Sequence, residues 1–195
     1  MDRERRQMRS IASKFETREA EGELLIEGYF AVFNTTYELW EGATESVAPG
    51  AFANTLGEDI RALIDHETRL VLGRNKAGTL ELREDSHGLW GRIRINPNDQ
   101  DAVNLYERVK RGDVSQCSFG FDIVSEETDF REDGSVHWTI TEVRLYEVSV
   151  VTFPAYEDTA VSARKRDFAQ LQQRENEKWR HEMRSRLKGD QKHGT

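Results

Sequence analysis

The fold of this chain is best inferred from one stretch, Gly112-Asp113-Val114-Ser115-Gln116-Cys117-Ser118-Phe119-Gly120-Phe121. From residue 116 onward the side chains alternate. Thiol and aromatic groups fall on one face, and polar or small groups fall on the other. This period of two predicts a β-strand that packs one face against a core. Because the aromatic face must be buried, we expect the Ser118 hydroxyl to point outward, toward solvent.

Further strands are predicted on both sides of this segment. Residues 24–33 are apolar on both alternating faces, which is typical of a strand that is covered on both sides. Residues 89–95 alternate as a half-buried strand does. Residues 136–151 also alternate, but the phase of the apolar positions changes near Thr141 and Glu142. That change predicts a bulge or a bend at this point.

Helices are expected in fewer places. The clearest spans 99–111, with Asn98 as the expected N-cap, acidic residues at its start, basic residues at its end and Gly112 as its stop. A short helical stretch is predicted around 49–56, with Gly57 after it. From residue 162 onward the apolar positions fall roughly on one stripe, which predicts an amphipathic C-terminal helix.

Together these elements predict an α+β protein that is mainly β. Because the helices do not alternate regularly with the strands, we expect about seven strands in a closed β-barrel flanked by helices. The chain has 195 residues, which is enough for one domain with a substantial core. We expect a flexible N-terminal arm at 1–20, a main domain at 21–162 and a charged C-terminal helix or tail at 163–195.

Composition excludes several classes of protein. No apolar run approaches the roughly 20 residues that a membrane-spanning helix needs. The net charge of −8 is uneven: residues 163–195 carry ten Lys and Arg against five Asp and Glu, or +5, which leaves −13 for the rest. An acidic body argues against nucleic acid as a specific partner. The single cysteine, Cys117, excludes an internal disulfide and is compatible with a reducing cytoplasm.

A histidine and a glutamate are the candidate partners of Ser118. His66 follows the apolar stretch 60–64 and lies between Asp65 and Glu67, whose charges favour the imidazolium that a general base must become. Glu147 lies in an apolar strand, where a carboxylate is costly unless it is paired. Pairing with an imidazole N–H would satisfy it. A surface ion pair with an arginine such as Arg144 would satisfy it equally well.

Other residues could act as the base, the nucleophile or a metal ligand. His137, on the polar face of a strand, is a second candidate base, whereas His87 lies in a turn and His181 and His193 lie in the tail. Cys117 is a rival nucleophile, but the alternation turns its thiol toward the core, where thiols are usually inert. His66-Glu67 begins like a zinc-helix motif, but the second ligand is missing because position 70 is Leu. A zinc protease is therefore disfavoured, and acyl transfer by a serine and a histidine requires no metal or cofactor.

An ordered series of segments resembles the prohead (capsid maturation) serine proteases of tailed bacteriophages, the HK97-type family. The resemblance covers about residues 24–160. Its segments are Gly28-Tyr29-Phe30-Ala31-Val32-Phe33, Ala48-Pro49-Gly50-Ala51-Phe52, Leu63-Ile64-Asp65-His66, Leu72-Gly73-Arg74, Thr79-Leu80-Glu81-Leu82, Asp85-Ser86-His87-Gly88-Leu89, Ser118-Phe119-Gly120-Phe121 and Glu147-Val148-Ser149-Val150-Val151-Thr152-Phe153-Pro154-Ala155.

The resemblance implies a serine endopeptidase with a fold similar to the herpesvirus assemblin proteases. Residue by residue, Ser118 matches the nucleophile and His66 the general base. Glu147 is the choice for the third member, where the herpesvirus relatives use a second histidine. The turn at Thr152-Phe153-Pro154-Ala155 is the suspected source of oxyanion donors.

The same resemblance implies partners and a location. In the cytoplasm of the infected host, the enzyme would be packaged inside the immature prohead, cleave the scaffolding part of the major capsid protein and finally digest itself. Analogy with the herpesvirus relatives suggests association into dimers. The alternative function is a non-catalytic assembly factor that binds capsid or scaffold through its C-terminal helix.

Overall fold

The computed structural model describes residues 7–12, 15–20, 22–131 and 133–153, together with short stretches at 164–165, 168–170, 173–174, 177–181 and 183–184. The chain separates into two compact units, Asp2–Glu157 and Asp158–Thr195. The described residues of the second unit are helical. The first unit holds every candidate site residue. No helix among the described residues is both long and apolar enough to cross a membrane.

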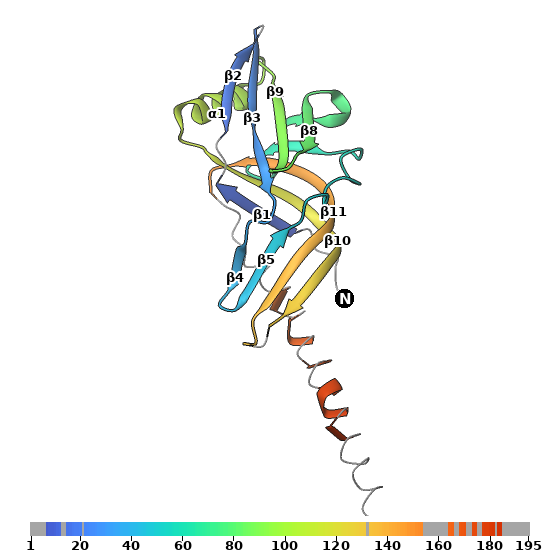
Figure 1. Ribbon diagram of the computed structural model, residues 1–195. Coiled ribbons are helices and arrows are strands. Elements are labelled where there is room, and N and C mark those ends of the chain that lie inside the picture. Colours follow the sequence, from blue (N-terminus) through green and yellow to red (C-terminus); the bar gives the residue numbers. More distant parts are fainter. Residues whose placement is uncertain are drawn as a thin grey trace, which may run out of the picture. The chain divides into compact units, whose positions relative to one another are not determined.

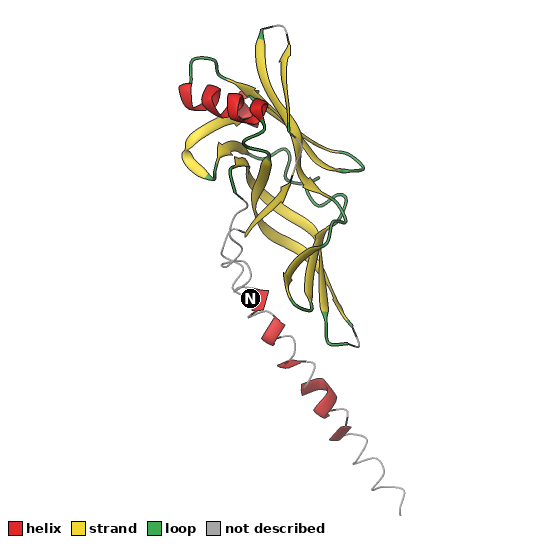
Figure 2. Ribbon diagram, turned by 90° about the vertical axis from the view of Figure 1, so that its left-hand side faces the viewer, coloured by secondary structure: helices red, strands yellow, loops and turns green. Residues whose placement is uncertain are grey.

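Two sheets make up the body of the first unit (Figures 1 and 2). The larger sheet has a central path of five strands, in the order β1 (Gln7–Ala12), β10 (Gln116–Phe130), β11 (Val136–Val151), β5 (Ala43–Val47) and β4 (Tyr37–Trp40). It also contains β6 (Arg61–Ile64), which pairs with β11, and β7 (Glu67–Arg74), which pairs with β6. The smaller sheet has the order β2 (Glu16–Ala20), β3 (Glu23–Val32), β9 (Gly88–Ile95) and β8 (Leu80–Glu84).

The predicted class, mainly β with few helices, is confirmed, but the closed barrel of about seven strands is wrong. Across the described residues the strands form open sheets of seven and four strands. The reason lies in β11, which pairs in parallel with β5 through Val136–Ile140 and with β6 through Glu147–Val150. One long strand therefore gives the sheet two branches on the same side. They end at β4 and β7, and in the described part of the chain neither strand pairs with β1 at the other end of the sheet.

The predicted irregularity in β11 is confirmed. Opposite it on β10, Ser125 pairs with Glu142, whereas the next residue, Glu126, pairs with Ile140. Thr141 is therefore an extra residue on β11, which is the definition of a bulge. The bulge explains the change of phase in the sequence. It also separates the half of β11 that faces β5 from the half that faces β6.

The main predicted helix is present as α1 (Gln100–Arg111), which contacts strands β2, β3, β7 and β9. Its N-cap is Asp99 rather than Asn98, because the Asp99 side chain accepts hydrogen bonds from the backbone N–H groups of residues 101 and 102. Gly112 ends the helix in a left-handed conformation, with φ of 88°. The described part of the body also contains a one-turn 3₁₀ helix, η1 (Asn75–Ala77).

The stretch expected to be helical around 49–56 consists of turns instead. Its hydrogen bonds run mostly from residue i+3 back to residue i, as from Ala51 to Ala48 and from Ala53 to Gly50. Such bonds make successive turns without a continuous α-helix. Phe52 is fully buried within this stretch, and it packs edge-on against Phe119. The spacing of the apolar residues therefore reflects packing against the core and does not indicate a helix.

The N-terminal residues also differ from the expected flexible arm, because β1 and β2 pair with the two sheets. In β1 the Arg9 side chain is fully buried, and its Nε lies 2.5 Å from Oε1 of Glu45, which is also fully buried. The Arg9 guanidinium lies 5.8 Å from the centre of the Phe121 ring. Because a charged residue occupies an inward position, the hydrophobic pattern does not reveal this strand.

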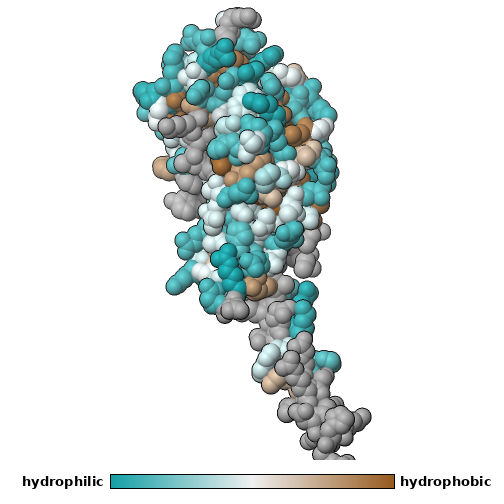
Figure 3. Space-filling view, viewed as in Figure 1, coloured by the Kyte–Doolittle hydropathy of each residue, from teal (hydrophilic) through white to brown (hydrophobic). Residues whose placement is uncertain are grey.

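The core combines apolar residues of both sheets with those of α1. Phe119 and Phe121 stack with ring centres 4.8 Å apart, which confirms that the aromatic face of β10 is buried. The face of the molecule in Figure 3 is mostly hydrophilic or neutral, with small hydrophobic patches scattered over it.

Candidate active site

The two-residue turn between β6 and β7 carries His66. Asp65 and His66 both have positive φ angles, 46° and 60°, as in the tight turns that connect twisted antiparallel strands. The Asp65 carboxylate accepts hydrogen bonds from the backbone N–H of Thr152 at 2.7 Å and from its Oγ1 at 3.2 Å. The Asp65 N–H donates to the carbonyl of Val150. These bonds hold the turn against the end of β11.

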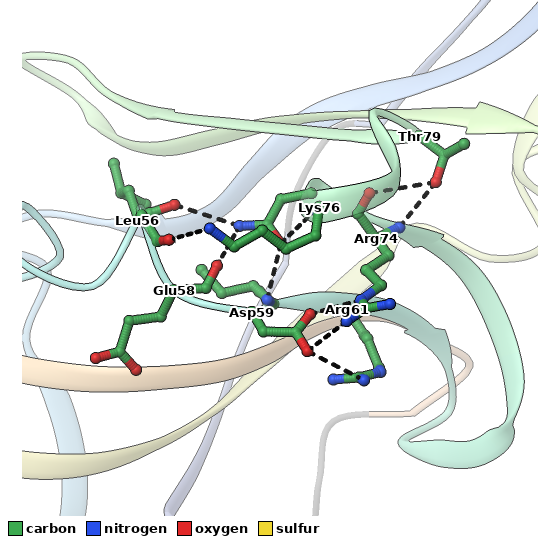
Figure 4. A network of polar contacts seen from close by, with 10 residues as sticks. Leu56, Glu58, Asp59, Arg61, Arg74, Lys76 and Thr79 are labelled. Carbon is green, nitrogen blue, oxygen red and sulfur yellow. Dashed lines mark hydrogen bonds and ion pairs between the residues drawn. The ribbon is translucent and has the colours of Figure 1, made fainter.

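A second set of contacts fixes the other end of β6 (Figure 4). Asp59 accepts two hydrogen bonds from Arg74, at 2.6 and 2.7 Å. The Arg74 guanidinium holds the pKa of the Asp59 carboxyl below its usual range. The Asn75 side chain accepts from the backbone N–H of Ile60 and donates to the carbonyl of Glu58. The segment that enters β6 is thereby fastened to the segment that leaves β7, so both ends of the hairpin are fixed.

His66 is hydrogen-bonded to Glu147. The His66 Nδ1 lies 2.7 Å from Oε1 of Glu147, and the second carboxylate oxygen accepts a 2.6 Å hydrogen bond from the Ser149 hydroxyl. The predicted pairing of Glu147 with an imidazole is confirmed, whereas Arg144 contacts Glu58 instead. Because the carboxylate accepts from Nδ1, that nitrogen carries the proton and Nε2 is left as the basic nitrogen.

Ser118 lies in the same part of the sheet. It is directly opposite Ser149 in the antiparallel pairing of β10 with β11, and Gly120 is opposite Glu147. Directly opposite residues have Cβ atoms about 4.5–5.5 Å apart and point to the same face. Ser118 therefore shares its face with Ser149, whose hydroxyl touches the carboxylate that holds His66. Since Gly120 has no side chain, it leaves space beside Glu147.

The expectation that the Ser118 hydroxyl points into solvent is wrong. Ser118 is fully buried, as is Ser149, and Glu147 is nearly so. The reason is that β10 is covered on both faces at this point, since every residue from Cys117 to Phe121 is buried. Among the described residues, neither Ser118 Oγ nor His66 Nε2 has a hydrogen-bond partner, although both atoms are buried. A hydroxyl donor and a basic nitrogen are thus available in one buried polar region.

The second candidate base, His137, belongs to a different cluster. Its Nδ1 lies 2.8 Å from Thr44 Oγ1 and its Nε2 lies 2.9 Å from Ser46 Oγ. Thr44 is directly opposite His137 in the parallel pairing of β5 with β11. These contacts are far along the strand from Glu147 and involve neither Ser118 nor His66.

Cys117, the rival nucleophile, is buried as the alternation predicts, and its thiol donates to the Tyr29 carbonyl at 3.1 Å. Its side chain lies on the face of β10 opposite to that of Ser118, away from Glu147. As for a metal centre, the described residues contain no group of three His, Cys, Asp or Glu side chains arranged to hold a metal ion.

The comparison with protein families decides the classification. The family described as Caudovirus prohead serine protease matches residues 13–174. The chain belongs to this family. It is 31% identical over 145 residues to the prohead protease of Enterobacteria phage HK97, and the match covers 72% of this chain and 60% of that protein. The chain therefore spans about 60% of the length of this curated relative.

A solved structure of a phage protease has a similar fold. The capsid assembly protease gp21 of bacteriophage T4 superposes with a TM-score of 0.53 at 12% identity, and the match covers 77% of this chain and 98% of that one. At this identity the likeness concerns the fold alone. The mainly β architecture is therefore shared with a structure from another phage.

Within this prohead protease fold, sequence reasoning misses part of what builds the site. The alternation places Ser149 on the face of Glu147 but does not reveal that its hydroxyl binds the carboxylate. The sequence shows Asp65 as a charge beside His66, yet its carboxylate accepts from Thr152. The Thr152 N–H is therefore engaged and is not a free oxyanion donor. Positions 154 and 155 of the suspected oxyanion turn lie outside the described residues.

Proposed function

We propose that the chain is a serine endopeptidase in which Ser118 is the nucleophile, His66 the general base and Glu147 the group that orients it. The observation that carries this proposal is the 2.7 Å bond between His66 Nδ1 and Glu147, which leaves Nε2 basic. A general base needs such a nitrogen, and a carboxylate partner stabilises the imidazolium that forms. The membership in the prohead serine protease family supports the same assignment.

The reaction follows from these three groups. The Ser118 oxygen attacks the carbonyl carbon of a peptide bond while His66 Nε2 takes the hydroxyl proton. The tetrahedral intermediate collapses when the C–N bond breaks and His66 returns the proton to the leaving amine. Water then attacks the acyl-enzyme ester, again with His66 as base, and releases the acid and Ser118. Glu147 stays ionised throughout and keeps its bond to the Nδ1 proton.

The proposed substrate is the scaffolding part of the major capsid protein of the phage, followed by the protease itself. The protein of phage HK97 is named a prohead protease and that of phage T4 a capsid assembly protease, which supports a role in capsid maturation. We place this activity inside the immature prohead, in the cytoplasm of the infected host. We also propose that the enzyme associates with a second copy of itself.

Co-expression with the precursor of the major capsid protein tests this function. The chain should shorten the capsid protein at a defined site, as measured by intact-protein mass spectrometry, and should also be cut itself. The Ser118→Ala variant should leave both proteins at full length while it keeps the circular dichroism spectrum and melting temperature of the parent. Full processing by Ser118→Ala would exclude Ser118 as the nucleophile.

A further inference from the structure

Ser149 lies in the same buried polar region as the three proposed catalytic groups. It follows Glu147 by two residues on β11, so the two side chains point to the same face of the strand. Its side chain is fully buried, and its hydroxyl donates a 2.6 Å hydrogen bond to Oε2 of Glu147. β11 runs beside β10, on which Ser118 is the residue directly opposite Ser149 (Figure 1).

Glu147 depends on two donors for a defined orientation. The last torsion of a glutamate side chain has only a broad preference, so a single hydrogen bond leaves the carboxylate freer to turn. The Glu147 side chain is 5% exposed, which leaves little access for water. Within the described ranges each of its oxygens has one donor, His66 Nδ1 on Oε1 and the Ser149 hydroxyl on Oε2. With Oε2 held by the serine, Oε1 is directed at the histidine.

The hydroxyl hydrogen of Ser149 is already used in this contact. A serine hydroxyl has one hydrogen to donate, so Ser149 cannot donate to Ser118 while it holds the carboxylate. Ser118 Oγ has no hydrogen-bond partner in the described part of the chain, so it does not donate to Ser149 either. Ser149 therefore does not compete with His66 for the proton of the proposed nucleophile, and its side-chain contact acts on Glu147.

We propose that Ser149 is a positioning residue, which fixes the Glu147 carboxylate so that Oε1 faces Nδ1 of His66. The imidazole ring is then held with Nε2 ready for proton transfer. This inference rests on the proposed function, since it takes His66 as the general base. Because Ser149 acts through Glu147 and does not contact the substrate, its loss should lower kcat and leave KM close to the parental value.

The first test is the rate of cleavage of the capsid precursor. Ser149→Ala should lower kcat by about 10- to 100-fold, which is the usual cost of losing a residue that orients a functional group. Ser46→Ala is the matched control, because Ser46 is also buried and its hydroxyl lies 2.9 Å from the His137 ring. The control should cleave at the parental rate, and both variants should have similar melting temperatures. A parental kcat in Ser149→Ala, or a loss seen only in KM, would overturn the proposal.

A double-mutant cycle separates positioning from a direct effect on another group. If Ser149 acts only through the carboxylate, adding Ser149→Ala to Glu147→Gln should change the rate by less than about twofold. A further loss of about tenfold or more in the double variant would overturn the proposal, because the two effects would then be independent. Ser149→Cys is a second replacement, and its weakly donating thiol should give a kcat between those of the parent and Ser149→Ala.

A second readout does not depend on cleavage. In Ser118→Ala protein with isotope-labelled histidine, NMR should show the Nδ1 proton of His66 as a low-field signal, which His66→Gln lacks. Adding Ser149→Ala should move this signal to higher field and speed its exchange with water. An unchanged or lower-field signal would refute the positioning role even if the parent cleaves the capsid precursor. A weakened signal in a chain whose parent cleaves nothing would instead refute the proposed function and leave the positioning role in place.

Discussion

Two histidines lie near opposite halves of β11, and their ring nitrogens have different hydrogen-bond partners. His66 gives Nδ1 to the Glu147 carboxylate, and its Nε2 has no hydrogen-bond partner among the described residues. His137 has a hydroxyl at each nitrogen, from Thr44 and from Ser46. The bulge at Thr141 lies between these two halves of β11.

The comparison shows that contact between a serine and a histidine is a weak sign of catalysis. Ser46 lies within 2.9 Å of an imidazole, yet the contacts of His137 among the described residues include no carboxylate that would stabilise an imidazolium. His137 instead links β11 to β5 through hydrogen bonds at both of its ring nitrogens. His66 has a carboxylate on one nitrogen and a basic lone pair on the other, which is what a general base requires.

The largest effect is expected from replacing each of the two histidines with the same residue. His66→Gln should lower kcat/KM for the capsid precursor by about 10⁶-fold, since loss of the base in a triad costs this much. His137→Gln should stay within about twofold of the parent, because glutamine still offers a donor and an acceptor to the hydroxyls. Similar losses in the two variants would remove the distinction between the two regions.

Removal of the carboxylate should have the next largest effect. Glu147→Gln keeps the shape of the side chain but cannot stabilise the imidazolium, so kcat should fall by about 10²- to 10⁴-fold with little change in KM. The matched control is Thr44→Val, which removes the oxygen at the corresponding nitrogen of His137. We expect that control to process the capsid precursor at the parental rate. A Glu147→Gln variant with full activity would show that the contact is structural.

Arg9→Ala tests the stability of the region around His137. The partner of Arg9 is Glu45. Glu45 lies on β5 between Thr44 and Ser46, the two residues that bind His137. Loss of one member of a buried ion pair usually costs about 3–5 kcal/mol in stability. Urea denaturation should show a decrease of this order in the free energy of unfolding. The control is Arg69→Ala, whose exposed contact with Glu67 at 3.8 Å should contribute nothing measurable. Equal stability of the two variants would contradict the burial of Arg9.

The smallest effect is expected from the turn that carries His66. Asp65→Asn weakens the bonds to Thr152, so the His66 ring should be positioned less well and kcat should fall by about ten- to a hundredfold. Glu67→Gln, on the other side of His66, is the control and should leave the rate unchanged. If both variants match the parent, the contacts between the turn and the end of β11 do not position the histidine.

The sequence predicts that Glu147 needs a partner because a carboxylate in an apolar strand is costly without one, but it leaves an imidazole and an arginine as alternatives. It predicts the bulge in β11 because the phase of the apolar positions changes there. It does not predict the burial of Ser118, because the small and polar residues on that face of β10 are typical of an exposed face, although the face is covered. It does not predict open sheets either. The pairing of β11 with two parallel neighbours joins segments that are far apart in the sequence, and no local pattern of residues reveals it.

The most direct test of the central claim is to map the serine that reacts with a fluorophosphonate, which modifies serines activated by a histidine. Peptide mass spectrometry should find the adduct on Ser118 in the parent, on Ser118 at a similar level in His137→Gln, and nowhere in His66→Gln. An adduct on Ser46, or undiminished labelling of Ser118 in His66→Gln, would contradict the account.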